Sequence, residues 1–512
     1  MKEWIAILDY GSQYTQLIAR RIREQHVYSE IIRFDTPADR LRERMPKGII
    51  LSGGPSSVFE DGAPGVDPAI FELGVPILGV CYGMQLMSQV LGGKVRPGEA
   101  REYGKTPMKT LPGNDLFKGL PDSFIVWMSH GDRVAEIPAG FEVGATSANC
   151  PYAAIRNPTR RLYGIQFHPE VVHTEYGNQI LSNFVFLICG AKGDWHLSAW
   201  IDETVEKMRE KIGDDEVVLG LSGGVDSSVV AVLLNRAIGR RLHCIFVDNG
   251  LLRMHEAEQV EAMFDAKLGF DLTVARAAKR FYAALDGLSD PEAKRKAIGR
   301  TFVDVFAEEA RRFSHCRFLG QGTIYPDVIE SSHALKGPSQ TIKSHHNVGG
   351  LPPDLKFELV EPLRDLFKDE VRAVGRELGM ASELLDRQPF PGPGLGVRIL
   401  GEVTEEKVRI LQEADLRVQE EVRKLPGYKT IWQTFAVLLP VRTVGVMGDQ
   451  RTYEYTCAVR SVDSVDAMTA DWTRIPFETL ATISNRIINE VRGINRVVYD
   501  ISSKPPATIE WE

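Results

Sequence analysis

The sequence lacks several features that would each place a protein in a particular class. Its six cysteines, at positions 81, 150, 189, 244, 316 and 457, form no Cys-x-x-Cys pair, which argues against a zinc cage or a disulfide framework. No apolar run reaches the roughly 18 residues that a membrane span needs, and the opening MKEWIAILDYGSQ does not resemble a signal peptide. A formal net charge of −8 indicates no bulk attraction to nucleic acid. We therefore expect a cytoplasmic protein with no nucleic-acid or membrane partner.

The 512 residues suffice for several domains. Short apolar runs that end at glycine-containing turns, followed by helical patterns, fill the first 190 residues and recur after residue 216. This alternation predicts an α/β protein with two doubly wound, mostly parallel sheet domains, followed by a small α+β domain. The predicted domains are 1–192, 193–387 and 388–512, and the proline- and glycine-rich stretch 388–398 marks the second boundary or a rigid linker.

The stretch GVCYG at 79–83 predicts a nucleophile elbow. Small residues around Cys81 permit a tight turn at a strand exit, and the helix N-terminus that follows favours a thiolate. FHPE supplies His168 as a general base and Glu170 as the group that orients it. The backbone N–H groups of Gly54 and Tyr82 are the expected oxyanion donors. Taken singly, a buried cysteine is more often a small apolar side chain, but together these residues predict acyl transfer through a thioester.

The stretch LGLSGGVDSSVV at 219–230 predicts a strand, a glycine turn and a helix. Backbone N–H groups in such a turn can surround an anion, and the hydroxyls of Ser222, Ser227 and Ser228 add donors. The loop lacks the lysine with which a Walker A loop holds a departing γ-phosphate. It could instead grip pyrophosphate while AMP is transferred, although a plain glycine turn with a serine N-cap would look similar.

These motifs resemble those of known families. GVCYGMQ, LSGGP and FHPE are similar to the class I glutamine amidotransferases, which implies that Cys81 attacks the side-chain amide of glutamine. LGLSGGVDSSV resembles the PP-loop of the N-type ATP pyrophosphatases, which implies Mg²⁺ bound with ATP and Asp226 near the metal and pyrophosphate. The ATP-binding residues implied by this resemblance are Ser222, Gly223, Gly224, Val225, Asp226, Ser227, Ser228, Val247 and Gly322.

Four further stretches, GQGTIYPDVIES, TIKSHHN, RQPFPGPGL and SKPPATIEWE, resemble the glutamine-hydrolysing GMP synthases, and the match runs over 1–512. The resemblance implies a ligase that uses glutamine, ATP and xanthosine 5′-monophosphate (XMP), and a homodimer joined by its last domain. The implied XMP-binding residues are Arg295, Gln433, Arg496, Lys504, Ile509 and Glu510, with Arg300 as plausible as Arg295. The implied lid residues are Asp327, Glu330, Lys343, His345 and His346.

Other interpretations remain open at this point. The SHH stretch could be a solvated loop, and the tail around Lys504 a frayed terminus. A PP-loop amidotransferase that makes asparagine or NAD would use a different glutaminase, and Met1–Lys2–Glu3 offers no N-terminal cysteine. A tRNA-thiolating enzyme is disfavoured by the absence of Cys-x-x-Cys pairs. A sensor or scaffold would predict a missing nucleophile or a damaged loop, and both are intact.

Overall fold

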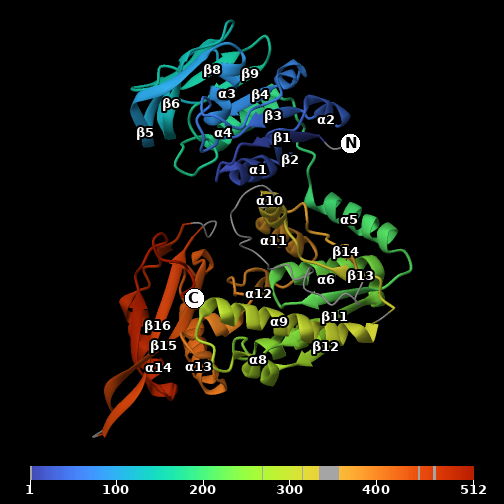
Figure 1. The fold of residues 1–512 in the computed structure, drawn as a ribbon, viewed down its shortest axis with the longest axis vertical. Coiled ribbons are helices and arrows are strands. Elements are labelled where there is room, and N and C mark those ends of the chain that lie inside the picture. Colours follow the sequence, from blue (N-terminus) through green and yellow to red (C-terminus); the bar gives the residue numbers. More distant parts are fainter. Residues whose placement is uncertain (1–2, 268, 314, 334–356, 448–449, 465–468) are drawn as a thin grey trace. The chain divides into compact units, whose positions relative to one another are not determined.

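The structure is a computed structural model that describes residues 3–267, 269–313, 315–333, 357–447, 450–464 and 469–512. Contacts group the chain into two units, Met1–Trp200 and Ile201–Glu512, and each is described by itself (Figure 1). The predicted division of the second unit at residue 387 stays a prediction. Among the described residues, no helix combines the length and the apolar character needed to cross a membrane.

The first unit is built on a nine-stranded sheet in the order β2-β1-β3-β4-β9-β8-β7-β5-β6. Its parallel part contains β1 (Trp4–Asp9), β2 (Tyr28–Arg33), β3 (Gly48–Leu51), β4 (Ile77–Val80) and β9 (Leu162–Ile165). The remaining strands pair antiparallel and are β5 (Lys94–Thr110), β6 (Ser123–Glu136), β7 (Glu142–Ser147) and β8 (Ala154–Asn157). This extension was not singled out from the sequence, because strands half exposed to water give weaker apolar runs.

Five α-helices occur in the described residues up to Ile212. Four of them are α1 (Thr15–Arg23), α2 (Ala38–Glu43), α3 (Tyr82–Val90) and α4 (Gly177–Ser182). The fifth, α5 (Leu197–Ile212), runs from the end of the first unit into the second, where Arg209 donates to the carbonyl of Ala237. Strands β1, β3, β4 and β9 are wholly buried, as expected of strands covered on both faces, whereas the edge strand β2 is mostly half-buried. Their carboxyl ends therefore lie at one edge, where α3 begins.

The second unit begins with an all-parallel sheet in the order β12-β11-β10-β13-β14. Its strands are β10 (Val217–Leu221), β11 (Leu242–Asp248), β12 (Asp271–Arg276), β13 (Phe318–Gly320) and β14 (Glu358–Val360). The strand order reverses at β10, which makes the carboxyl end of β10 a topological switch point and a preferred ligand position. The predicted glycine turn follows β10 directly.

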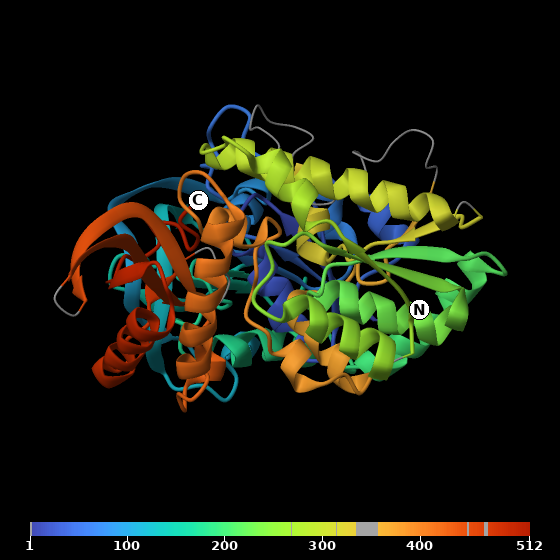
Figure 2. The ribbon, with the colours of Figure 1, turned by 90° about the horizontal axis from the view of Figure 1, so that it is seen from below.

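The helices around this sheet are α6 (Val225–Ile238), α7 (Glu256–Glu261), α8 (Ala278–Leu285), α9 (Pro291–Ala310), α10 (Tyr325–His333), α11 (Lys368–Glu377) and α12 (Ser382–Leu385). In Figure 2 the long helix α9, coloured yellow, runs across one side of the green strands. Helix α6 packs against β10 and β11, and α11 packs on α6. The prediction of two α/β units with mostly parallel sheets is confirmed.

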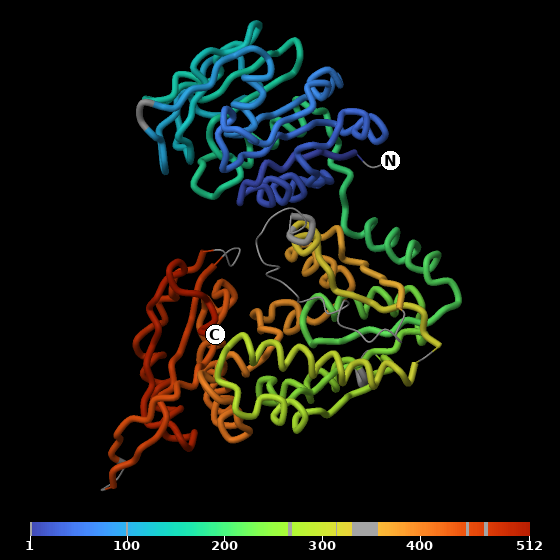
Figure 3. Tube along the Cα trace, viewed as in Figure 1, coloured from blue at the N-terminus to red at the C-terminus, as the bar shows by residue number. Residues whose placement is uncertain are grey.

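The last part of the chain is an α+β arrangement, as predicted. It contains α13 (Glu405–Val422), β15 (Gln433–Met447), β16 (Gln450–Asp463), β17 (Asp471–Trp472), α14 (Phe477–Glu490) and β18 (Ile494–Asp500). Strands β15 and β16 form a long hairpin that extends beyond the rest of the unit (Figure 3).

The stretch 388–398 is largely buried within the second unit, and its role as a boundary or a rigid linker stays a prediction. Leu395, Val397 and Arg398 have no exposed surface. One hydrophobic cluster contains residues of the parallel sheet, such as Val218 and Ile245, together with residues of α13 and β16. The two halves of this unit therefore share a core.

Candidate active sites

Cys81 occupies the strained turn that the Gly-x-Cys-x-Gly spacing predicts. It follows β4, precedes the first residue of α3 and has a φ of 50°, which a non-glycine residue rarely adopts. A Cβ on Gly83 would lie 2.2 Å from the carbonyl oxygen of Leu51, and one on Gly79 would lie 2.6 Å from the nitrogen of Met84. The N–H of Cys81 donates to the carbonyl of Ile165 in β9 at 2.8 Å. The turn is therefore held from both sides.

His168 and Glu170 form a buried dyad beside Cys81. The Nδ1 of His168 lies 2.7 Å from an Oε1 of Glu170, and both side chains are buried. Burial by itself disfavours the imidazolium, but the Glu170 carboxylate and the hydrogen bond to Cys81 outweigh it and raise the pKa of His168 well above its ordinary value. With Nδ1 bound to Glu170, Nε2 is the nitrogen left for proton exchange with the thiol. The arrangement suits nucleophilic catalysis.

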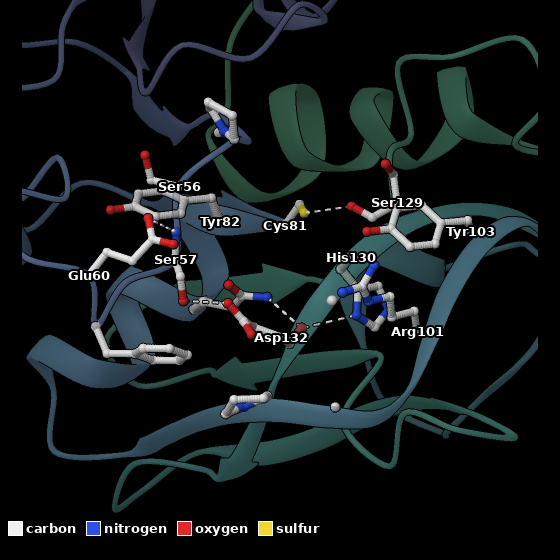
Figure 4. A pocket seen from close by; sticks show the side chains of 17 residues that line it. Ser56, Ser57, Glu60, Cys81, Tyr82, Arg101, Tyr103, Ser129, His130 and Asp132 are labelled. Atoms are coloured by element: carbon white, nitrogen blue, oxygen red, sulfur yellow. Dashed lines mark hydrogen bonds between the residues drawn. The ribbon is translucent and has the colours of Figure 1, made fainter.

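The predicted oxyanion donors lie at a cavity of about 630 Å³ that opens onto Cys81 (Figure 4). Gly54 and Tyr82 both line this cavity. Tyr82 is the first residue of α3, so its N–H has no partner inside the helix. A Cβ on Gly53 would lie 3.1 Å from the His168 ring, so the loop at 51–55 closely approaches the dyad.

Further residues of this cavity had not been predicted from the sequence. Figure 4 shows Ser129, His130 and Asp132 on one strand, β6, which lines the cavity; the Ser129 carbonyl accepts from the Cys81 thiol, and the Asp132 carboxylate accepts from the Ser57 hydroxyl. His130 is buried, with Nε2 3.1 Å from Glu102 and Nδ1 3.0 Å from the carbonyl of Asp132. Burial lowers the pKa of His130, and the Glu102 carboxylate opposes that shift in part. The strand motif WMSHGD was the available signal, but a strand with mixed polarity did not by itself indicate a site.

The glycine loop connects β10 to α6 as predicted. Gly223 has a φ of +72°, a left-handed conformation that glycine accepts without strain. Ser222 and Ser227 bond to each other through their hydroxyls at 2.9 Å, and the Ser228 hydroxyl donates to the Gly224 carbonyl at 2.7 Å. The serines thus shape the loop itself. Val225 is the first residue of helix α6. The free N–H groups at a helix N-terminus can bind an anion such as the predicted pyrophosphate.

Asp226 is paired with a lysine that sequence reasoning missed. The Nζ of Lys368, the first residue of α11, lies 2.7 and 2.6 Å from the two carboxylate oxygens of Asp226. Nothing in the local sequence joins residues 142 positions apart. Arg387, also missed, donates to the carbonyl of Gly223 at 3.0 Å. Two cations therefore stand beside the predicted pyrophosphate loop.

The other two predicted ATP-binding residues have different surroundings. A Cβ on Gly322 would lie 3.3 Å from Cβ of Asp226, so the backbone there approaches the loop closely. Val247 is buried in the hydrophobic cluster, so its backbone and not its side chain could face a nucleotide.

Three of the predicted XMP residues lie together near the end of the chain. Gln433 donates to Glu510 at 2.8 Å, and Glu510 also accepts two hydrogen bonds from Arg398, at 3.1 and 2.9 Å. Ile509 is buried beside them, and its carbonyl accepts from Arg460 at 3.3 Å. Arg398 was missed, although it is fully buried, and its Nη1 has no hydrogen-bond partner within the described residues. Arg398 therefore keeps one buried N–H donor without an acceptor among these residues.

The remaining XMP residues are more dispersed. Lys504 forms a backbone bridge with Ala470, the residue before β17. Strand β17 pairs with the end of β16 at Val462, and Val462 is also the partner of Gln433 in β15. Arg496 instead pairs with Thr456, six residues along β16 from Val462, the partner of Gln433, which corresponds to about 20 Å. Within one chain the structure therefore does not bring Arg496 to Gln433.

The predicted arginines of α9 and two of the predicted lid residues lie on helices of the second unit. Arg295 donates to the backbone oxygen of Glu512, whereas Arg300 is exposed. Asp327 accepts from the N–H of Ile324 at 3.1 Å at the start of α10, the helix that also contains Glu330. Lys343, His345 and His346 lie outside the described residues. The roles of all these residues stay predictions.

Comparisons with known families divide the chain in the same order as its motifs. The profile of the class-I glutamine amidotransferases matches residues 6–188, that of NAD synthase residues 196–294, and that of the GMP synthase C-terminal domain residues 420–511. The NAD synthase match covers only the glycine-loop part of the second unit, so it describes the ATP-binding module.

Curated relatives match the chain from end to end. A "GMP synthase [glutamine-hydrolyzing]" of Maridesulfovibrio salexigens is 59% identical over 510 residues, covering 99% of both chains. Proteins with the same name from Geobacillus kaustophilus (58% identical, covering all of both chains) and Caldicellulosiruptor saccharolyticus (57%, covering 100% of this chain and 99% of that one) are similar.

Proposed function

The chain belongs to the glutamine-hydrolysing GMP synthases, and from this premise we propose that it aminates XMP to GMP with ammonia taken from glutamine. The observation that carries the proposal is the presence, on one chain, of a cysteine on a strained turn beside a buried His–Glu dyad and of a glycine loop at a switch point of a parallel sheet. The overall reaction would be XMP, ATP, glutamine and water to GMP, AMP, pyrophosphate and glutamate.

In the first half-reaction, His168 takes the proton of the Cys81 thiol and the sulfur attacks the side-chain carbonyl carbon of glutamine. The N–H groups of Tyr82 and Gly54 stabilise the oxyanion that forms. His168 then gives the proton to the leaving nitrogen, so that ammonia departs and a thioester remains. Water, deprotonated by His168, attacks the thioester and releases glutamate, and the proton returns to the sulfur. Glu170 holds the His168 ring throughout and favours its charged form.

The cavity beside Cys81 suits a free amino acid. Its volume of about 630 Å³ lies within the usual range for small-molecule sites. Arg101 could pair with the α-carboxylate of glutamine, and Glu60 or Asp132, on the lining of the same cavity, with its α-ammonium group.

In the second half-reaction, the C2 oxygen of XMP attacks the α-phosphorus of ATP, and pyrophosphate leaves. Ammonia then adds at C2, AMP leaves with the oxygen, and GMP forms. The loop at Ser222–Ser228 would hold the pyrophosphate, with Lys368 and Arg387 offsetting its charge. The purine would lie near Gln433 and Glu510, where the unpaired Nη1 of Arg398 can donate to an oxygen of xanthine.

Mg²⁺ is the metal that this chemistry calls for, because it binds phosphate and carboxylate oxygens. Asp226, partly exposed beside the loop, is a donor of the right kind. When bound, the ion would neutralise charge on the departing pyrophosphate. Lys368 would then exchange its carboxylate partner for phosphate oxygens.

A crossed pair of variants tests the two-site division. We expect Cys81→Ala to abolish GMP formation from glutamine and to leave formation from added ammonium salt intact. Asp226→Ala should abolish both. GMP, AMP and pyrophosphate would be quantified in parallel by chromatography. Equal loss from both nitrogen sources in Cys81→Ala would refute the division, and release of ADP in place of AMP would refute the pyrophosphate role of the loop.

We further propose that two chains associate through the β15–β16 hairpin, in the cytoplasm. Supporting this, Val444, Val446 and Tyr453 are 52%, 72% and 58% exposed on the hairpin, and Val444 lies directly opposite Tyr453. Contiguous apolar surface of this kind is usually covered by a partner. Val446→Asp should shift the sedimentation coefficient toward that of a monomer. The control Met45→Asp, at an exposed apolar position of the first unit, should not; an unchanged dimer in Val446→Asp would locate the interface elsewhere.

A further inference from the structure

Four metal-ligating side chains converge at the edge of the second sheet opposite the glycine loop. They are Glu216, directly before β10, His243, near the start of β11, and the adjacent pair His315 and Cys316, which precede β13. Their ligand atoms all lie within 4.8 Å of one another. Glu216 is six residues upstream of Ser222, about 20 Å along the strand, so this cluster is separate from the ATP-binding loop.

The contacts inside the cluster are unusual for a plain hydrogen-bonded network. One carboxylate oxygen, Oε2 of Glu216, lies 2.7 Å from Nε2 of His243, 2.6 Å from Nε2 of His315 and 3.8 Å from Sγ of Cys316. Three donors therefore point at a single oxygen that has two lone pairs. A cation at their centre would replace these protons and turn all four atoms into ligands.

The second contact of His243 fits a metal ligand. Its Nδ1 lies 2.6 Å from Oδ2 of Asp271, the first residue of β12. A carboxylate on the far nitrogen fixes the tautomer that presents a lone pair on Nε2, and this is the arrangement in which histidine commonly binds metals. The ring is also stacked on Phe313, with centroids 4.5 Å apart, which fixes its plane. Its two ring nitrogens thus both face carboxylates, Asp271 on one side and Glu216 on the other.

We propose that Glu216, His243, His315 and Cys316 bind one divalent transition-metal ion of the Zn²⁺ class. Two imidazoles, one thiolate and one carboxylate are a ligand set that zinc accepts, and four protein ligands are typical of a structural zinc site. Tetrahedral bonds of about 2.0–2.3 Å would place the ligand atoms about 3.3–3.8 Å apart, so the two imidazoles need to move from Glu216 by under 1 Å. The thiolate and the carboxylate together balance the charge of the ion.

Accessibility and number favour this cluster over the other such group in the described residues. Glu102, His130 and Cys150 also lie close together, but they are three and all are buried. In the proposed site the His315 side chain is 59% exposed, which gives an ion a path of entry, while that of His243 is 13% exposed. A bound ion would tie β10, β11 and the segment before β13 together, so the site stabilises the sheet and takes no part in the chemistry at the opposite edge.

Cobalt substitution tests the proposal on the full chain, prepared without a histidine tag and after chelator treatment. The Cys81→Ala background removes the reactive thiol beside His168 as a competing ligand. We expect Co²⁺ to give a thiolate-to-cobalt charge-transfer band that saturates at one equivalent per chain and disappears when Zn²⁺ is added. Added Zn²⁺ should also raise the midpoint of thermal unfolding.

Variants then identify the ligands. The band should be lost in Cys316→Ser and in His315→Ala, whose exposed side chain can be removed without disturbing the core. Asp271→Asn should keep the band but weaken Co²⁺ binding by about 10- to 100-fold, as expected of a group that orients a ligand. Cys150→Ser is the matched control and should bind as the parent does. Absence of the band, its persistence in Cys316→Ser, or its loss in Cys150→Ser would each overturn the proposal.

Discussion

Glu170 is the buried partner of His168 in the first candidate site. It is 1% exposed, one of its oxygens contacts His168, and the other has no hydrogen-bond partner within the described residues. A buried carboxylate with so few partners directs its charge toward the imidazole. The proton affinity of His168 therefore depends on this neighbour two positions along the chain, together with the contact to Cys81.

We expect Glu170→Gln to lower glutaminase kcat by about 10²- to 10⁴-fold. Because the variant removes the charge that raises the pKa of His168, the limb of the pH–rate profile governed by this residue should move to lower pH. Measurement of kcat/KM for glutamine against pH checks both effects. Glu142→Gln, at a surface ion pair, is the control. A profile that stays in place in Glu170→Gln would show that another group raises the pKa.

The same pKa shift affects stability with a definite sign. His168 holds its proton more tightly in the folded chain than at its ordinary value of 6.5. Its contribution is thus fully present below about pH 6.5 and is lost as pH rises through the raised pKa. Glu170→Gln should reduce this dependence in unfolding experiments.

At the scale of elements, the elbow between β4 and α3 requires glycines that leave room for close backbone packing, as well as the unusual backbone conformation of Cys81. Gly83 packs its backbone against Leu51 in β3, and Gly79 packs against the first turn of α3. These contacts let the helix start directly above the sheet, so that its N-terminus meets Cys81. The glycines were predicted because the turn is local, whereas the contact with β3 is a tertiary one.

Gly83→Ala should therefore damage the glutaminase selectively. The new Cβ would lie 2.2 Å from the Leu51 carbonyl oxygen, so the elbow must shift, at a cost of about 1–3 kcal/mol. We expect glutamine-dependent GMP formation to fall at least tenfold while ammonia-dependent formation persists. Gly65→Ala is the control, because its Cβ would meet no atom within 4 Å. Equal activity of the two variants with glutamine would mean that the elbow is more adaptable than its packing indicates.

At the scale of the whole second unit, buried charges join segments that are distant in sequence. Lys294 in α9 has no exposed surface and donates to the carbonyls of Gly396, Ile399 and Gly401, at 3.2, 2.8 and 3.0 Å. It also forms an ion pair with Glu512. One ammonium group thus binds backbone carbonyls at the end of the 388–398 stretch and just after it. It also holds the end of the chain near Arg398 and Glu510, where we place the purine.

We expect Lys294→Met to destabilise this unit by about 3–5 kcal/mol, the usual result of removing one partner of a buried ion pair. Hydrogen exchange of residues 394–401 in the full chain should show lost protection. Lys296→Met, two positions along the same helix, removes only an exposed pair with Glu292 and should cost less than about 1 kcal/mol. Comparable protection in both variants would show that the stretch is held by apolar packing alone.

The sequence by itself determined the family and indicated the two candidate sites. Their chemistry resides in contiguous motifs, since an elbow, a strand-exit His-x-Glu and a glycine loop are each formed by residues within a few positions of one another. The alternation of short apolar runs with helical patterns likewise determined the α/β class, because buried parallel strands are nearly continuous apolar runs in the sequence.

Only the tertiary structure decided which distant charges meet. Lys368 faces Asp226 across 142 positions, Arg398 pairs with Glu510, and four ligating side chains gather at the start of the second sheet. The same topology places Arg496 about 20 Å from Gln433 within one chain. These pairings follow from strand order and register. No local sequence pattern predicts them, because the two partners are distant in sequence and meet only when the chain folds.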